Sequence, residues 1–158
     1  MADRPDYQAV IDAACCRFGV RMRGHELLSI DFLPRTWLLV DATERNVSAI
    51  VQQIEAYLVD PQQSISCRRF SQGTPFQQRV WQRLRQIPPG STLTYGALAA
   101  ELGTSPRAVG NACRANPCPL VVPCHRVVAA TGLGGFAGRR SGTKLAIKAW
   151  LLRHEGAL

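Results

Sequence analysis

The sequence predicts a mixed α/β fold of the α+β type in two parts, and three patterns in the 158-residue chain carry this prediction. Apolar residues cluster and alternate over residues 9–33, as they do in antiparallel strands. Residues 44–58 repeat apolar side chains at helical spacing, and residues 74–114 hold two successive helix-and-turn signals. We therefore expect a small sheet with one covering helix in residues 1–70 and a largely helical domain in residues 71–158.

The first part is expected to hold two or three strands and one helix. The stretch AVIDAACCRFGVRM fits one strand, Gly24 supplies a turn, and LLSIDFL alternates as a second strand that ends before Pro34. WLLV at residues 37–40 is a candidate third strand. The helix over residues 44–58 has apolar side chains at i, i+3, i+4, i+7 and i+11, and it ends before Pro61. Nothing in this part is typical of a catalytic site.

The second part is expected to contain a helix-turn-helix. Thr74 is a favourable N-cap with proline after it, and Thr94 is expected to cap a second helix that ends at Gly103. A short turn then leads into RAVGNACRAN, which completes the helix, turn and helix outline. PLVV at residues 119–122 is expected to form a short strand, interrupted by PCHR and then resumed, before a final helix near residues 143–155.

Charge is divided unevenly between the two parts. Residues 1–67 carry 6 Arg against 9 Asp and Glu, a net charge of −3, whereas residues 68–158 carry 13 Lys and Arg against 2 Glu, a net charge of +11. A strongly basic half indicates a polyanionic partner, and Arg, which supplies 17 of the 19 cations, suits phosphate and base contacts. A solvated basic surface is the alternative explanation.

The composition excludes several classes of protein. Hydrophobic residues make up 46% of the chain and charged residues 19%, which is typical of a folded globular protein and not of a disordered one. No apolar run reaches the ~20 residues of a membrane span, and the start MADRPDYQAV lacks the features of a secretory signal. We expect a cytoplasmic location, or a nuclear one in a eukaryote, with no membrane partner.

The six cysteines are expected to be reduced thiols, because the cytosol keeps thiols reduced and neighbours such as Cys15 and Cys16 rarely pair. No CxxC pair is present, so no metal is expected. A structural zinc bound by Cys15 or Cys16 together with His25 and Cys67 is the alternative. The glycine-rich loop at residues 132–144 lacks the order of a Walker phosphate-binding loop.

The most informative local feature is the motif Pro-Cys-His-Arg around Cys124. We interpret Cys124 as an activated nucleophile, with a buried structural thiol as the alternative. The positive charges of His125 and Arg126 are expected to lower the pKa of the thiol from ~8.5. His125 would reach the sulfur through a bent backbone or a water, since neighbours in an extended segment face opposite ways. Glu155 is the better candidate to orient the histidine, because Glu101 is expected to be solvated.

Four segments of the basic half resemble, in this order, the O6-alkylguanine-DNA alkyltransferases, also called methylated-DNA–protein-cysteine methyltransferases. They read GTPFQQRVWQRLRQIPPGSTLTYGALAAELG, RAVGNACRANP, VVPCHRVV and WLLRHEG. The resemblance runs from Gly73 to Gly156, just over half of the chain, and the combination of RAVG with PCHRV is highly specific. The first 70 residues match the family only in size and layout.

The resemblance implies a ribonuclease-H-like domain in residues 1–70 and a winged-helix or helix-turn-helix domain in residues 71–158 that approaches double-stranded DNA from the minor groove. Family members flip O6-alkylguanine out of the duplex, with O4-alkylthymine as a further candidate substrate. They transfer the alkyl group irreversibly to a cysteine, so each molecule reacts once. The resemblance also implies no cofactor and a monomer, of which several can lie side by side on DNA.

Carried over residue by residue, the resemblance assigns a role to each catalytic candidate. Cys124 corresponds to the alkyl acceptor, His125 to a base that acts through a water, and Glu155 to the group that orients this histidine. Asn116 corresponds to the residue that braces the active-site turn. Tyr95 corresponds to the tyrosine that contacts the flipped base and rotates its phosphate, with a core-capping aromatic as the alternative.

The resemblance also assigns contacts with DNA and with the flipped base. Arg107 corresponds to an arginine that fills the vacated stack, with a phosphate contact as the alternative, and Val127 offers a carbonyl to the guanine amine. Phe136 stands where the family has a tyrosine in the substrate loop. The other candidates for DNA or substrate contact are Gly110, Ala112, Cys113 and Arg114 on the recognition helix and Ala137 in the loop.

Three other functions compete with alkyl transfer. Alkyltransferase-like lesion sensors resemble this fold but replace the acceptor cysteine, so the presence of Cys124 argues against a sensor. A cysteine hydrolase would use Cys124 with His125 and would act without DNA. A transcription factor would read sequence through the helix-turn-helix and would keep its function after loss of the cysteine.

Overall fold

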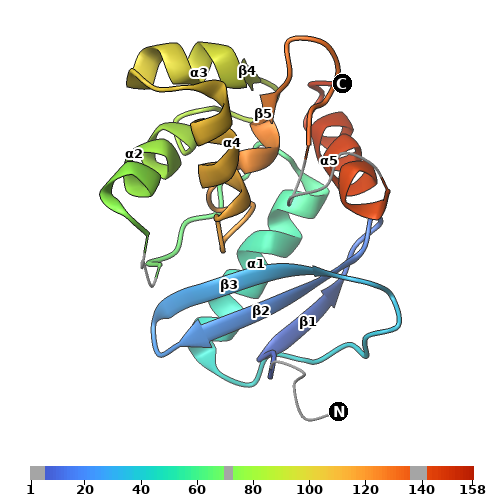
Figure 1. Ribbon diagram of the computed structural model, residues 1–158. Coiled ribbons are helices and arrows are strands. Elements are labelled where there is room, and N and C mark those ends of the chain that lie inside the picture. The colour runs from blue at the N-terminus through green and yellow to red at the C-terminus, as the bar shows by residue number, and fades with distance from the viewer. Residues whose placement is uncertain (1–5, 70–72, 136–141) are drawn as a thin grey trace. The chain divides into compact units, whose positions relative to one another are not determined.

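The computed structural model describes residues 6–69, 73–135 and 142–158. The chain divides into two compact units, Met1–Ser71 and Gln72–Leu158, whose elements Figure 1 labels. Among the described residues, the first unit holds a three-stranded antiparallel sheet and one helix. The second holds four α-helices, a short 3-10 helix and a two-stranded pair. The predicted mixed α/β fold with a small antiparallel sheet is therefore confirmed.

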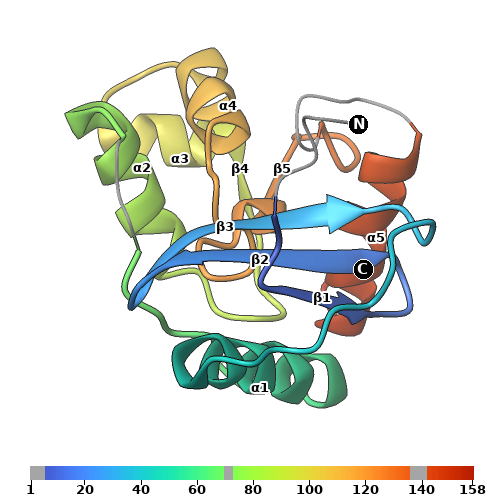
Figure 2. The ribbon, with the colours of Figure 1, turned by 90° about the horizontal axis from the view of Figure 1, so that it is seen from below.

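The sheet of the first unit has the strand order β1-β2-β3. Its strands are β1 (Ala9–Asp12), β2 (Arg17–Arg23) and β3 (Glu26–Leu33), which Figure 2 shows side by side. Gly24 turns β2 into β3 with a φ of +60°, a conformation that favours glycine. The expectation of a single strand before Gly24 is wrong. Residues 13–16 form a turn there, closed by a hydrogen bond from Ala13 N to Cys16 O (3.0 Å).

The candidate strand at residues 37–40 is not formed. Of its four residues, Val40 alone pairs, through an isolated bridge to Val10 in β1. Leu38 and Leu39 stay 82% and 53% exposed. Apolar residues favour a strand because they pack on a covered sheet face, and a single bridge gives Leu38 and Leu39 no such face.

The predicted covering helix is present as α1 (Arg45–Val59). Figure 2 shows α1 lying along one face of the sheet, where it contacts β1 and β2. Tyr57 takes the buried place that we expected for Leu58, which is half-exposed. The buried side chains of α1 are Val47, Ile50, Val51, Ile54 and Tyr57. The helical spacing of the sequence therefore identified four of the five buried positions.

The second unit begins with three predicted helices, two of them predicted from capping signals and the third from the segment RAVGNACRAN. They are α2 (Pro75–Leu84), α3 (Tyr95–Leu102) and α4 (Pro106–Arg114). The N-cap hydroxyls of Thr74, Thr94 and Ser105 each accept a backbone N–H of the first turn. Gly103 ends α3 with a φ of +66°, and the chain then enters α4. The helix, turn and helix outline is therefore present.

Two side chains of α2 tie the helix-turn-helix together. Trp81 is buried, and its Nε1 donates to the carbonyl of Ala112 in α4 at 2.8 Å. Arg83 forms an ion pair with Glu101 of α3, with 2.7 Å between Arg83 Nε and Glu101 Oε2. Glu101 is exposed, as expected.

The end of the chain differs from expectation in two places. The apolar residues 119–122 form a turn instead of a strand, and Leu120 adopts a φ of +75° there. The strand after PCHR is β5 (Val127–Val128), which pairs in parallel with β4 (Leu93–Thr94). The final helix is α5 (Thr143–His154).

The buried face of α5 is not the one we expected. Leu145 and Trp150 are half-exposed, and the ring of Trp150 stacks on His154 with 4.9 Å between centroids. Lys148 and Ala149 are buried in their place, together with the expected Ile147, Leu151 and Leu152.

Candidate active site

A turn braced by one side chain leads into the candidate nucleophile. Asn116 Nδ2 donates to the carbonyl of Val122 at 2.8 Å, and Asn116 Oδ1 accepts from the backbone N–H of Cys118 at 3.0 Å. The N–H of Val122 in turn donates to the carbonyl of Cys118 at 2.9 Å. These bonds hold Leu120 in its left-handed conformation, which an unbraced leucine avoids. The amide of Asn116 therefore contacts two backbone groups of the turn that leads to Cys124.

Within the segment PCHR, which we expected to interrupt a strand, residues Cys124–Arg126 form a 3-10 turn. The N–H of Cys124 donates to the carbonyl of Val122 at 2.8 Å, and that of Arg126 donates to the carbonyl of Pro123 at 3.1 Å. The backbone is therefore bent, which is one of the two routes by which we expected His125 to reach its neighbour. Cys124 keeps 8% of its surface exposed.

A buried carboxylate joins the two residues that follow the cysteine. His125 Nε2 lies 2.8 Å from Glu155 Oε2. Arg126 donates from Nε to Glu155 Oε1 at 2.9 Å and from Nη2 to Oε2 at 2.8 Å. Its third nitrogen, Nη1, donates to the carbonyl of Ile87 at 2.6 Å. Glu155 therefore bridges His125 and Arg126, and the paired guanidinium holds the carboxylate in place.

The other ring nitrogen of His125, Nδ1, takes no part in this hydrogen-bond network. Bonding to Glu155 places the imidazole proton on Nε2, which leaves Nδ1 as an acceptor. Nδ1 is buried and has no hydrogen-bond partner among the described residues. Burial lowers the pKa of His125, although Glu155 opposes this effect. A neutral imidazole with a free acceptor nitrogen can take up a proton, directly or through a water.

Lys148 is a functional candidate that the sequence analysis missed. It is fully buried on α5, and its Nζ donates to the carbonyls of Val127 (2.7 Å) and Gly135 (2.8 Å). The same Nζ lies 5.6 Å from the ring centroid of Tyr95. Burial lowers the pKa of Lys148 to about 8, whereas the neighbouring thiols oppose this fall. Lys148, Leu151, Leu152 and Glu155 follow the spacing i, i+3, i+4 and i+7, a buried stripe with a polar residue at each end.

The electrostatics of Cys124 correct the sequence-based expectation. Burial raises the pKa of Cys124, and the Asn116 side chain and the charge of Lys148 oppose this rise. We expected His125 and Arg126 to lower the pKa of the thiol, which is wrong. The charge of Arg126 is engaged by a carboxylate, and burial keeps His125 neutral. Among the described residues, the cation that lowers the pKa of Cys124 is Lys148.

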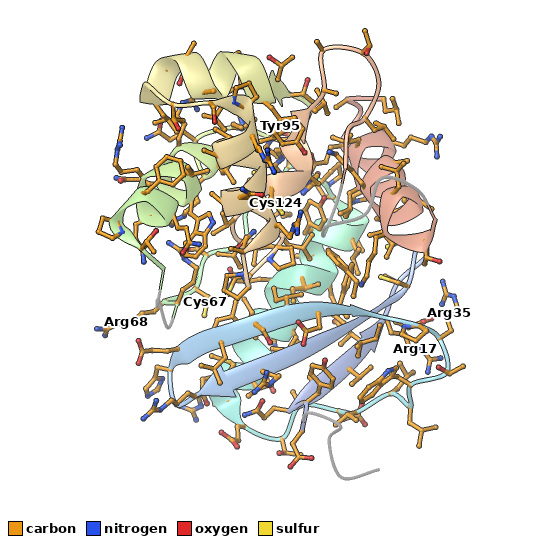
Figure 3. All side chains as sticks on the ribbon, viewed as in Figure 1. Arg17, Arg35, Cys67, Arg68, Tyr95 and Cys124 are labelled. Carbon is orange, nitrogen blue, oxygen red and sulfur yellow. The ribbon has the colours of Figure 1, made fainter. Side chains whose placement is uncertain are left out.

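Tyr95 forms part of the same site. Figure 3 shows it at the start of α3, above the turn that carries Cys124. Its hydroxyl donates to the carbonyl of Gly135 at 3.3 Å. Burial, followed by the charges of Cys113 and Cys124, raises the pKa of Tyr95, so the phenol stays protonated. Val127, which we expected to offer its carbonyl to the substrate, already accepts from Lys148 with that oxygen.

The candidates on α4 divide between its two sides. Arg107 in the first turn and Arg114 in the last are exposed, and nothing lies within 4 Å of a side chain built at Gly110. Ala112 is 2% exposed, so the expectation that it faces a groove is wrong. Burial and the charge of Cys124 raise the pKa of Cys113, which places this thiol beside the site. The candidates Phe136 and Ala137 lie outside the described residues.

The described ranges contain no group of three or more His, Cys, Asp or Glu that could hold a metal ion. The alternative zinc set of Cys15 or Cys16 with His25 and Cys67 is therefore not assembled there. In the same ranges, no helix has the length and apolar character needed to cross a membrane.

Comparison with known proteins places these features in a family. The family described as "6-O-methylguanine DNA methyltransferase, DNA binding domain" matches residues 75–157. The methylated-DNA–protein-cysteine methyltransferase of Salmonella typhimurium is 55% identical over 89 residues, which are 54% of this chain and 49% of that protein. A DNA base-flipping protein of Thermus thermophilus is 54% identical over 86 residues, which are 54% of this chain and 55% of that protein. The chain thus spans about half the length of these two relatives.

Two further similarities extend over most of the chain. The methylated-DNA–protein-cysteine methyltransferase of Methanosarcina acetivorans is 39% identical over 139 residues, which are 86% of this chain and 82% of that protein. The structure of this chain is similar to the crystal structure of Mycobacterium tuberculosis OGT in complex with DNA, with a TM-score of 0.77 and 34% sequence identity. The similarity covers 94% of this chain and 91% of the Mycobacterium tuberculosis chain. Because the family match alone covers more than half of the sequence, the chain belongs to the 6-O-methylguanine DNA methyltransferase family.

Proposed function

We propose that this protein repairs DNA by direct reversal and transfers the alkyl group of O6-alkylguanine to its own Cys124. The observation that carries the proposal is the buried arrangement around His125. His125 directly follows Cys124 in the sequence. Its Nε2 is hydrogen-bonded to Glu155, and its Nδ1 is an acceptor with no partner among the described residues. Membership of the methyltransferase family supports the same function.

The reaction needs one proton transfer and one displacement. The thiol of Cys124 gives its proton to His125 Nδ1 through a water, and Lys148 stabilises the thiolate. The sulfur attacks the alkyl carbon in line, so that an S–C bond forms while the C–O6 bond breaks. The electron pair stays on the leaving guanine, toward which the hydroxyl of Tyr95 can turn the hydrogen that it donates to Gly135 in the free protein. The thioether does not break down in water, so each molecule reacts once.

The proposed encounter with DNA uses α4 and its basic surroundings. Arg107 and Arg114 are exposed at the two ends of the helix, and Gly110 between them lets the backbone approach a groove. We assign the helix-turn-helix, as part of a winged-helix domain, to the minor groove, and Arg107 to the space left by the flipped base. The first unit is proposed to be ribonuclease-H-like, and the protein to bind as a monomer, several of which can lie side by side.

A non-catalytic lesion sensor is the second candidate function, because a DNA base-flipping protein is among the similar relatives. The two functions differ in what happens to the lesion. A sensor binds the modified base and leaves it intact, whereas a transferase returns guanine and keeps the alkyl group.

A duplex oligonucleotide with one O6-methylguanine distinguishes these functions. We expect intact mass spectrometry to show one added methyl group per chain, and peptide mapping to place it on Cys124. The Cys124→Ser variant should bind the same duplex and gain no methyl group, whereas Cys67→Ser should react as the parent does. A methyl group on another cysteine, or lesion binding without any methylation, would refute alkyl transfer to Cys124.

A further inference from the structure

The turn between β1 and β2 carries two adjacent thiols that the proposed function does not use. The Sγ atoms of Cys15 and Cys16 lie 3.6 Å apart. The hydrogen bond from Ala13 N to Cys16 O closes this turn at 3.0 Å. In a strand, the side chains of adjacent residues point to opposite faces. The turn that breaks the expected strand is therefore what brings the two sulfurs together.

One arginine fixes the backbone of this turn, and a second contacts the aspartate that precedes it. Arg35 Nη2 donates to the carbonyls of Ala13 and Ala14, both at 2.6 Å, and Arg35 Nη1 donates to Asp12 Oδ1 at 2.7 Å. Arg17 Nε contacts the same carboxylate oxygen at 3.3 Å. Figure 3 shows Arg17 and Arg35 together at one end of the sheet. The backbone that carries the sulfur pair is thus held in place before any ligand arrives, which lowers the entropy lost on binding.

The thiol pair also has the electrostatics of a reactive site. The Cys16 side chain, followed by backbone N–H groups and the charge of Arg35, lowers the pKa of Cys15 against the effect of burial. Cys15 is half-exposed, whereas Cys16 is 4% exposed. Cys67 provides the contrast within the same unit, because burial raises its pKa. Cys15 therefore carries more thiolate at neutral pH than Cys67 does.

The separation of the sulfurs matches a chelate and not a disulfide. Two sulfurs bonded at ~2.3 Å to one pyramidal or tetrahedral centre lie about 3.4 to 3.8 Å apart, whereas a disulfide needs about 2.0 Å. The 3.6 Å between the two Sγ atoms matches the separation of two sulfurs bonded to one centre. In the described ranges, no third His, Cys, Asp or Glu completes a metal-binding group around the pair. A fitting ligand therefore needs two sulfurs and no more.

We propose that Cys15 and Cys16 form a dithiol site that binds monosubstituted trivalent arsenicals. With phenylarsine oxide, both S–H bonds break, two As–S bonds form, and the oxygen leaves with the two protons as water. Arsenic stays trivalent, so the step needs no oxidant or reductant. This site belongs to the first unit and acts independently of alkyl transfer.

Phenylarsine oxide with intact mass spectrometry tests the proposal. We expect one phenylarsenic adduct per chain that survives excess mercaptoethanol and is removed by the dithiol dimercaptopropanol. Cys15→Ala and Cys16→Ala should each lose this adduct, while Cys67→Ala and Cys113→Ala should keep it. Cys113→Ala matters because Cys113 and Cys124 are the other neighbouring thiols.

The Cys15→Ala variant is expected to fold, because Cys15 is half-exposed and the buried side chain of Cys16 stays in place. Unchanged circular dichroism of Cys15→Ala would confirm that its loss of the adduct is not a loss of folding. An adduct that persists in Cys15→Ala, or that peptide mapping places on Cys113 and Cys124, would overturn the proposal. So would an adduct on the parent protein that mercaptoethanol removes.

Discussion

His125 Nε2 and Glu155 Oε2 lie 2.8 Å apart, and neither side chain is more than 1% exposed. The same carboxylate accepts two hydrogen bonds from Arg126. One buried group thus sets the tautomer of the histidine and balances the charge of the arginine. Removal of its charge should therefore affect both reactivity and stability.

The Glu155→Gln variant tests this double role. We expect single-turnover methyl transfer to slow by about a hundredfold, the size of a lost general-base contribution. The free energy of unfolding in urea should fall by about 3 kcal/mol, because Arg126 loses its buried partner. The matched control is Glu101→Gln, whose ion pair with Arg83 is exposed to solvent and so contributes much less to stability. Equal losses in the two variants would contradict the role of Glu155.

Lys148→Met should raise the pKa of the Cys124 thiol, since it removes the cation that opposes the effect of burial. The pH dependence of Cys124 alkylation by iodoacetamide, followed by peptide mapping, measures this shift. Lys144→Met is the matched control, because Lys144 lies on the same helix and is half-exposed. An unchanged pH profile in Lys148→Met would show that the lysine serves packing alone.

Stability should depend on pH through His125. Its pKa is lowered in the folded protein, mainly by burial, so the unfolded chain binds more protons between that lowered pKa and ~6.5. The free energy of unfolding should therefore rise with pH through this window and fall as the solution becomes more acidic. His125→Gln should flatten the dependence, whereas replacement of the exposed His25 by Gln should not. Urea titrations between pH 5 and pH 8, flanking ~6.5, measure it.

Arg107→Ala should slow the repair of duplex DNA more than the reaction with free O6-benzylguanine. A side chain that fills the gap left by the flipped base contributes only in duplex DNA, because the free base has no base stack. Arg153→Ala removes an equal charge from an exposed position on α5 and serves as the control. Equal slowing of both reactions in Arg107→Ala would exclude the proposed role. Equal slowing of duplex repair by both variants would instead indicate general charge.

The features that the sequence predicted correctly are local ones. The caps at Thr74 and Thr94 depend on a few neighbouring residues, and so does the end of α3 at Gly103. The pairing of His125 with Glu155 spans 30 positions and was accessible only through the family resemblance and the scarcity of acids in the basic half.

Features that depend on distant contacts and that no motif marks could not be predicted. The turn that splits the first strand has no glycine or proline, and it is held by Arg35 from beyond the sheet. From the sequence, Lys148 is predicted to be a surface residue, because lysines are usually exposed. Its partners are the backbone carbonyls of Val127 and Gly135. Every residue has such a carbonyl, so the sequence does not indicate which ones bind a lysine.

The burial of Cys124 has a consequence for the lifetime of the unreacted protein. Small electrophiles in solution modify thiols according to their exposure and thiolate content. Cys124 is 8% exposed and burial raises its pKa, whereas Cys15 is half-exposed and has a lowered pKa. Diffusing alkylating agents should therefore modify Cys15 well before Cys124. Under the proposed single-turnover transfer, this difference would protect Cys124 from inactivation before the protein meets a lesion.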